Sequence, residues 1–162
     1  MGRLNGQWTQ RLSADDRLEL RFGLGQSEYN QNMVQTPIRQ SGTPLLSSAV
    51  DAQRFTDRST SLNGKWTRVL ENGHQWVSGG EMESVRRTQS TLGAYQTIPG
   101  SADFRASSIR HALYSQDEWQ LTQHWATHLG ARYEGLTTQG NTATGDVTNR
   151  NSVFTPLLHA MW

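Results

Sequence analysis

The chain of 162 residues contains no cysteine and only four prolines, and its 15 basic and 14 acidic residues leave a net charge of +1. A charge this close to zero predicts neither nucleic acid nor an anionic surface as a partner. No run of 18 apolar residues occurs, which excludes a transmembrane helix. The start of the chain is also not a secretory signal, because Met1 leads straight into a polar, extended segment.

Sequence motifs of enzymes and metal sites are missing as well. There is no Gly-x-Ser-x-Gly, no Walker-type sequence and no Gly-x-Gly-x-x-Gly. His124 and His128 have a spacing that binds zinc on a helix, but they lie in an expected turn and strand, where they do not converge. Asp117 and Glu118 point to opposite faces of a strand and cannot act as an acid/base pair. We therefore predict no enzymatic activity, no metal site and no cofactor.

The composition is low in hydrophobic residues for a soluble domain. They make up 34% of the chain, the mean hydropathy is −0.70, and there are 15 glycines and six tryptophans. A soluble domain is typically ~45–50% apolar by a count that includes glycine. The values suit a wall one sheet thick, in which every second residue faces water. Disorder would also lower the hydropathy, but the tryptophans and the alternation described next argue against it.

Two segments show apolar residues at every second position. In residues 125–135 one face carries Trp125, Leu129 and Tyr133, while the other carries small or charged residues. Side chains alternate across a strand, and a membrane β-barrel requires such a pattern, with lipid on one side and water or polar protein on the other. A helix would scatter the leucines and include internal glycines. The clearest alternation sets Leu18, Leu20, Phe22 and Leu24 against Arg17, Glu19, Arg21 and Gly23.

The segments come in pairs joined alternately by short and long connections. Short turns are expected at residues 13–16, 71–73 and 122–124, and the Asn72-Gly73 pair is a strong hairpin signal. Long loops are expected at residues 30–51, 89–103 and 138–150, where proline, glycine and polar residues break the pattern. The expected strands are residues 4–12, 17–29, 54–69, 74–88, 109–121 and 125–138, with a seventh from residue 152.

A short internal sequence repeat supports this arrangement of strands and turns. Residues 4–10 (LNGQWTQ) reappear as residues 62–68 (LNGKWTR), and tryptophans recur at nearly equal spacing close to the short turns. This favours an aromatic belt at one membrane interface. In the strand at residues 111–121, Leu113 and Trp119 share a face with Asp117, so the pattern leaves its lipid-facing register open. The expected interface aromatics are Trp8, Trp66, Trp76, Trp119, Trp125 and Tyr133.

The hairpin from residue 109 to residue 138 resembles that of a known family. Residues 114–121 read YSQDEWQL, Trp125 follows, and residues 130–134 read GARYE. This run resembles a barrel hairpin of TonB-dependent outer-membrane receptors, and residues 151–156 (NSVFTP) resemble the start of the family's next strand. The resemblance implies a barrel of about 22 strands around an N-terminal plug, in the outer membrane of a Gram-negative bacterium. It also implies import of ferric siderophores, cobalamin or another scarce nutrient with energy transmitted by TonB.

From the pattern and the resemblance we predict an all-β fold. It is an antiparallel up-and-down meander of about seven strands, part of a transmembrane β-barrel. Residues 1–162 are expected to form a β-barrel segment without a plug domain or TonB box. Outer-membrane lipid, the nutrient, and TonB acting through a plug outside this chain are the expected partners. Two alternatives stay open at this point: a complete outer-membrane barrel of the small eight-stranded type, and a soluble lipocalin-like ligand-binding module.

Charged residues opposite the apolar faces are expected to line the lumen, where they pair with each other, with water or with a plug. They are Glu19, Arg21, Glu81, Glu83, Arg87, Arg132 and Glu134. Arginine and tyrosine suit recognition of an iron chelate by charge, forked hydrogen bonds and stacking. The candidate ligand contacts around the second long loop are Arg86, Arg87, Tyr95 and Arg105.

Overall fold

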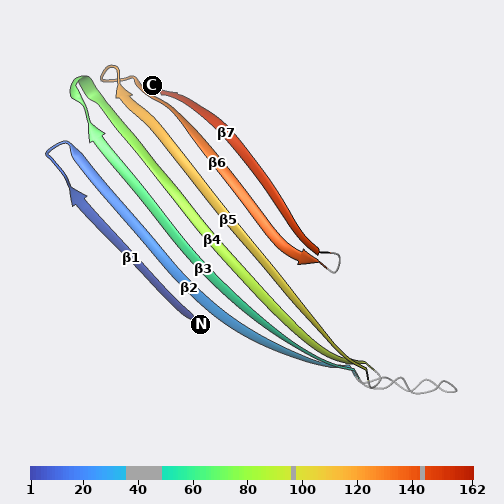
Figure 1. Ribbon diagram of the computed structural model, residues 1–162. Helices are drawn as coiled ribbons and strands as arrows, with labels where there is room; N and C mark the ends of the chain where they lie inside the picture. Colours follow the sequence, from blue (N-terminus) through green and yellow to red (C-terminus); the bar gives the residue numbers. More distant parts are fainter. Residues whose placement is uncertain (36–48, 96–97, 143–144) are drawn as a thin grey trace.

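The computed structural model describes residues 1–35, 49–95, 98–142 and 145–162. Within these ranges the chain forms one antiparallel sheet in which each strand pairs with the next, in the order β1 to β7 (Figure 1). This confirms the predicted seven-stranded meander. The strands are β1 (Gly2–Arg11), β2 (Asp16–Gln35), β3 (Ala49–Val69), β4 (His74–Tyr95), β5 (Ile98–Gln120), β6 (Ala126–Thr142) and β7 (Gly145–Met161), with a 3-10 turn, η1 (Glu71–Gly73).

Within the described residues, no helix is long and apolar enough to cross a membrane.

The three short connections lie at one end of the sheet, which we call the turn end; the opposite end is the distal end (Figure 1). In the β1–β2 turn, the Ser13 Oγ accepts hydrogen bonds from two backbone amides, at 3.2 and 3.0 Å. The Thr122 Oγ1 does the same in the β5–β6 turn. Asn72 and Gly73 adopt φ values of 63° and 78°, a conformation that these two residue types tolerate best. The predicted turns at residues 13–16, 71–73 and 122–124 are therefore confirmed.

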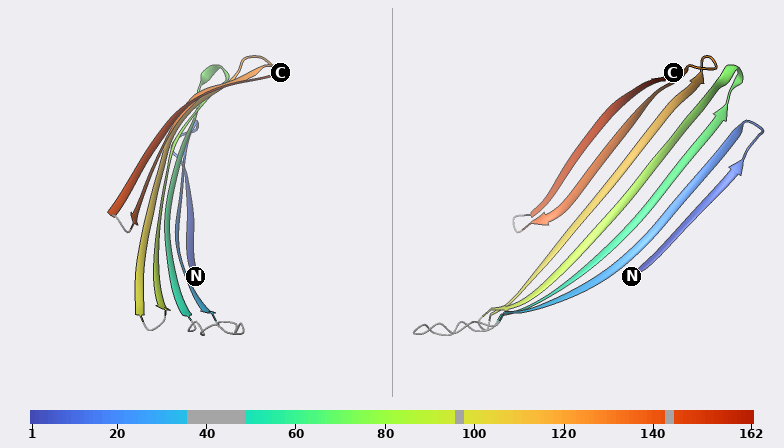
Figure 2. Two further views of the ribbon diagram at one scale, coloured as in Figure 1. Left: turned by 90° about the vertical axis from the view of Figure 1, so that its right-hand side faces the viewer. Right: turned by 180° about the vertical axis from the view of Figure 1, so that it is seen from behind.

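The sheet is a single curved layer when it is viewed along its edge (Figure 2). We call the face that carries Leu18 and Phe22 the outer face, and the one that carries Glu81 and Arg132 the inner face. Val77 and Ala112, both on the inner face, are the buried hydrophobic residues of the described chain. The outer face leaves its large apolar side chains uncovered, including Leu4, Trp8, Phe22, Leu24, Leu62, Met82, Leu113, Leu129, Phe154 and Leu158. The sheet thus has no core of its own.

The strand register decides the orientation of the segment at residues 111–121. Leu113 lies opposite Tyr133, and Asp117 lies opposite Leu129, which places all four on the outer face. Asp117 is the charged exception on this face of the segment. It lies near the turn end, where it accepts a 2.7 Å hydrogen bond from His74. The apolar side of this segment is therefore the outer side, although its last turn-end residues include charged groups.

The three predicted long loops are shorter than expected. The second, expected at residues 89–103, is mostly strand, because β4 continues to Tyr95 and β5 begins at Ile98. Likewise β6 extends to Thr142 and β7 begins at Gly145, so that most of residues 138–150 is paired. Of the first loop, residues 36–48 lie outside the described residues, and the flanks belong to β2 and β3. The error arose because glycine, proline and polar residues interrupt the apolar alternation in these segments, whereas the hydrogen-bonded ladder does not require an apolar face.

Close packing between strands gives a stability prediction. A Cβ added at Gly79 would lie 2.5 Å from the Gly64 carbonyl oxygen and would also meet the Tyr114 ring. We expect Gly79→Ala to lower the free energy of unfolding by about 1–3 kcal/mol. Gly2→Ala is the control, since a Cβ at Gly2 meets nothing within 4 Å. Urea unfolding in detergent micelles measures both, and equal stabilities would contradict this packing.

Candidate functional site on the inner face

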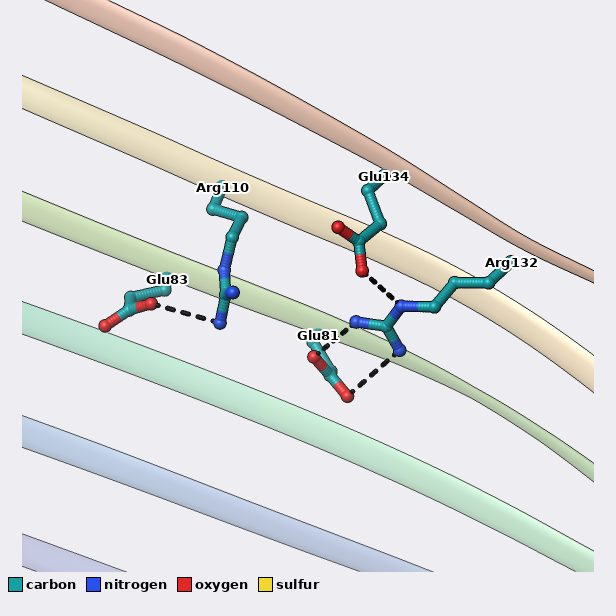
Figure 3. Close-up of polar contacts among 5 residues, drawn as sticks. All are labelled: Glu81, Glu83, Arg110, Arg132 and Glu134. Atoms are coloured by element: carbon teal, nitrogen blue, oxygen red, sulfur yellow. Dashed lines mark hydrogen bonds and ion pairs between the residues drawn. The ribbon is translucent and has the colours of Figure 1, made fainter. Parts of the chain in front are cut away.

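A cluster of charged side chains lies at the centre of the inner face. Arg132 on β6 reaches across β5 to Glu81 on β4, with 2.9 Å between its Nη2 and the Glu81 Oε2. Its Nε also donates to Glu134 on its own strand. The three side chains point toward one another above β5, beside a second pair formed by Glu83 and Arg110 (Figure 3). One guanidinium therefore bridges two carboxylates from strands that are not adjacent.

The residues of β5 make this bridge possible. Ala112 stands directly between Glu81 and Glu134 in one cross-strand row and is only 2% exposed. A larger residue there would occupy the space in which the arginine crosses the strand. In the neighbouring row the Arg132 guanidinium carbon lies 5.7 Å from the centre of the Tyr114 ring, within cation–π range. Small and aromatic residues of β5 thus hold the charges of β4 and β6 together.

The remaining predicted lumenal charges also find partners on this face. Arg110 and Glu83 are 3.4 Å apart. Glu19 lies 3.1 Å from Arg17 and 3.6 Å from Arg21, its neighbours two positions away on β2. All seven predicted lumenal charges lie on the inner face, each within 4 Å of an opposite charge. The inner face is consequently charged yet nearly neutral over short distances.

The four candidate ligand contacts do not form one cluster. Arg87 lies on the inner face and donates two hydrogen bonds, of 2.7 and 2.8 Å, to the carboxylate of Asp57 on β3. Arg86 and Arg105 lie on the outer face, on the distal side of Met82 and Ile109. Tyr95 is the last residue of β4, and its side chain lies outside the described part of the structure. Ligand contact by these residues stays a prediction.

We call the apolar side chains of the outer face between the turn end and the row of Leu24 and Ile109 the apolar band. The Arg87–Asp57 pair lies toward the distal end, beyond this band. The hydrogen bond from the Arg87 guanidinium holds the pKa of the Asp57 carboxyl below its usual value, because it favours the charged form. Both side chains keep contact with solvent, at 56% and 33% exposure. The pair is therefore an accessible, ionised feature of the inner face.

An aromatic row that the sequence pattern did not indicate lies next to this pair. Tyr29 on β2 and Phe55 on β3 are directly opposite each other, with ring centroids 6.2 Å apart. The row continues through Gln89 on β4 to Phe104 on β5. We call Tyr29, Phe55 and Phe104 the inner aromatic row. The three residues belong to strand ends that were expected to be near or in loops, and only the register aligns them.

The expected interface aromatics mostly lie near the turn end. Trp8, Trp66, Trp76 and Trp119 are on the outer face, within four residues of the end of their strands, and Trp125 lies in the β5–β6 turn. Tyr133 is on the outer face as well, but midway along β6. Their role at a membrane interface stays a prediction.

Among the described residues, no group of three or more histidine, aspartate or glutamate side chains is placed to hold a metal ion.

Residues 2–162 match the sequence model of the family described as TonB dependent receptor-like, beta-barrel. The unliganded ferric citrate transporter FecA aligns with 98% of this chain and 24% of its own, at 14% identity and a TM-score of 0.70. The ferric yersiniabactin uptake receptor FyuA from Yersinia pestis aligns over 98% and 25%, at 16% identity and a TM-score of 0.50. The chain spans about a quarter of these solved structures, whose likeness shows the fold. No curated protein matches it.

The bridge over β5 leads to a second stability prediction. Arg132→Met would leave Glu81 and Glu134 without their shared partner, and we expect it to lower the unfolding free energy by about 1–3 kcal/mol. Arg110→Met is the matched control. It removes a single 3.4 Å contact between half-exposed groups, and its cost should stay below about 1 kcal/mol. Thermal unfolding in detergent compares the two, and a larger loss for Arg110→Met would refute the bridge.

Proposed function

Because the chain belongs to the family of TonB-dependent receptor β-barrels, we propose that it forms part of the wall of an outer-membrane nutrient importer. The barrels of this family reside in the outer membrane of Gram-negative bacteria, and we assign this chain to the same place. FecA is a transporter of ferric citrate and FyuA takes up ferric yersiniabactin. These similarities support a ferric siderophore or a comparable scarce nutrient as the cargo.

The observation that carries the proposal is the contrast between the two faces of one layer. The outer face exposes leucine and aromatic side chains, while the inner face bears ion pairs. A lipocalin-like module would enclose its apolar face, and here that face is open. A small closed barrel would pair its first and last strands, whereas β1 and β7 each have one neighbour in the described sheet. Lipid outside and a polar lumen inside account for both faces at once.

We place the turn end at the periplasmic side and the distal end outside the cell, because outer-membrane barrels have short periplasmic turns and longer extracellular connections. The four central strands β2 to β5 have 20 to 23 residues, about twice the ~9–11 that cross a membrane. Their distal halves therefore project above the bilayer. A nutrient arriving from outside meets these halves first.

The inner aromatic row and Arg87 lie in that projecting half and suit a chelated ferric ion. Aromatic faces stack on planar chelating groups, and a guanidinium binds carboxylate or hydroxamate oxygens through forked hydrogen bonds. Asp57 occupies two of the five N–H donors of Arg87, so that donors remain for a ligand. We propose Arg87, Tyr29, Phe55 and Phe104 as ligand contacts from this part of the wall.

Transport requires a plug and a contact with TonB, which we place outside residues 1–162. The charged cluster around Arg132 lies on the inner face (Figure 3), and we propose that this face points toward the plug of the parent barrel. Since each of its charges already has a partner of opposite sign, the wall can guide a plug without holding it by an unpaired charge.

The location is tested by fractionating cells that make the protein. We expect it in the outer-membrane fraction, and to need detergent for extraction, because its outer face is apolar. Recovery of a stable monomer from the soluble fraction would contradict the proposal.

The ligand surface is tested by exchanging one phenylalanine on each face. Phe104 is 42% exposed on the inner face and Phe22 is 47% exposed on the outer face, so the two truncations are comparable. We expect Phe104→Ala to weaken binding of the cognate ferric chelate about tenfold, the loss of one stacking contact, and Phe22→Ala to leave it unchanged. Intrinsic fluorescence titration measures both affinities. Equal affinities would exclude Phe104 from the ligand surface.

A further inference from the structure

Two arginines on the outer face lie directly opposite each other. Arg58 on β3 and Arg86 on β4 are cross-strand partners, and both are exposed. Their other neighbours in the same row, Gln26 on β2 and Ser107 on β5, are uncharged. Like charges placed directly opposite each other on a sheet are destabilising unless something neutralises them.

A third arginine adds to the imbalance. Arg105 on β5 is two positions from the cross-strand partner of Arg86, on the same face, and is also exposed. None of these three guanidinium groups has an ion pair within the described ranges. Of the acids nearby on this face, Glu28 is held at 2.7 Å by Arg54, and no ion pair within the described ranges joins Asp103 to an arginine. The three residues, which we call the outer arginine patch, therefore carry unneutralised positive charge.

The height of the outer arginine patch places it at a membrane surface. Arg86 lies four residues beyond Met82 on β4, Arg58 lies four beyond Leu62 on β3, and the next row toward the turn end holds Leu24 and Ile109. At ~3.3 Å per residue and a tilt of ~40°, the two arginines rise about 10 Å above Met82 and Leu62, and about 5 Å above the row of Leu24 and Ile109. The headgroup layer is about 5–8 Å thick, and long arginine stems bend toward it.

We propose that Arg58, Arg86 and Arg105 bind the phosphate groups of lipids in the outer leaflet. The inference rests on the membrane placement proposed above and is independent of which nutrient is carried. A phosphate between Arg58 and Arg86 accepts forked hydrogen bonds from both guanidinium groups and removes their mutual repulsion. The acyl chains of the same lipid then lie along the apolar band directly below. Charge and apolar surface thus match the two parts of one molecule.

The test uses the native protein extracted from outer membranes and titrated in micelles with a bisphosphorylated glycolipid, lipid A. Binding is measured by native mass spectrometry for the wild type and for the double variant R58Q/R86Q. Each arginine near an anionic lipid contributes about a factor of five, so the double variant should bind roughly 30-fold more weakly. Dephosphorylated lipid A should bind both proteins equally, because its phosphates are the recognised groups.

Arg87→Gln is the matched control, because Arg87 is adjacent to Arg86 in sequence but lies on the inner face. It should leave lipid A binding unchanged. Unaltered binding by R58Q/R86Q, an equal loss in Arg87→Gln, or displacement of the lipid by inorganic phosphate at the same concentration would each overturn the site. If R58Q/R86Q fractionates with the outer membrane and binds its nutrient normally, then an unaltered affinity for lipid A refutes the outer arginine patch alone and leaves the proposed function intact. Absence of the wild type from the membrane would refute the proposed function instead.

Discussion

The whole structure depends on a sheet one layer thick meeting two different surroundings. Apart from the outer edges of β1 and β7, the backbone donors and acceptors of the described sheet are paired between neighbouring strands, so the side chains decide what each face can contact. With Val77 and Ala112 as its buried apolar residues, the described sheet gains little from a core. Its stability must come from the ladder, from side-chain pairs across strands and from lipid against the outer face. In the outer-membrane location that we propose, lipid covers the outer face.

The inner face shows how such a wall carries charge without a compensating core. Arg132 joins Glu81 to Glu134 across a strand, and this is possible because Ala112 is small and Tyr114 offers an aromatic surface. Cross-strand pairing thus performs the role that packing performs in a soluble protein. Local pairing of opposite charges also keeps the inner face polar without a strong concentration of one sign.

The net charge of +1 conceals how the charges are distributed. The seven charges predicted to line the lumen are paired on the inner face, whereas the three arginines of the outer arginine patch form no ion pair within the described residues. Arg86 and Arg87 illustrate the difference: they are consecutive, but one faces outward beside Arg58 and the other faces inward to Asp57. Composition alone argued against an anionic surface as a partner, because an average over the chain cannot register a patch on one face.

The sequence by itself determined the strands, the short turns and the two-sided character of the wall, because alternation and the Asn72-Gly73 turn are local properties of the chain. It did not determine the extent of the polar strand ends, whose pairing leaves no apolar pattern. It also could not align Tyr29, Phe55 and Phe104, or choose the lipid-facing side of residues 111–121. Those features depend on register between strands far apart in the chain, and only the tertiary structure decided them.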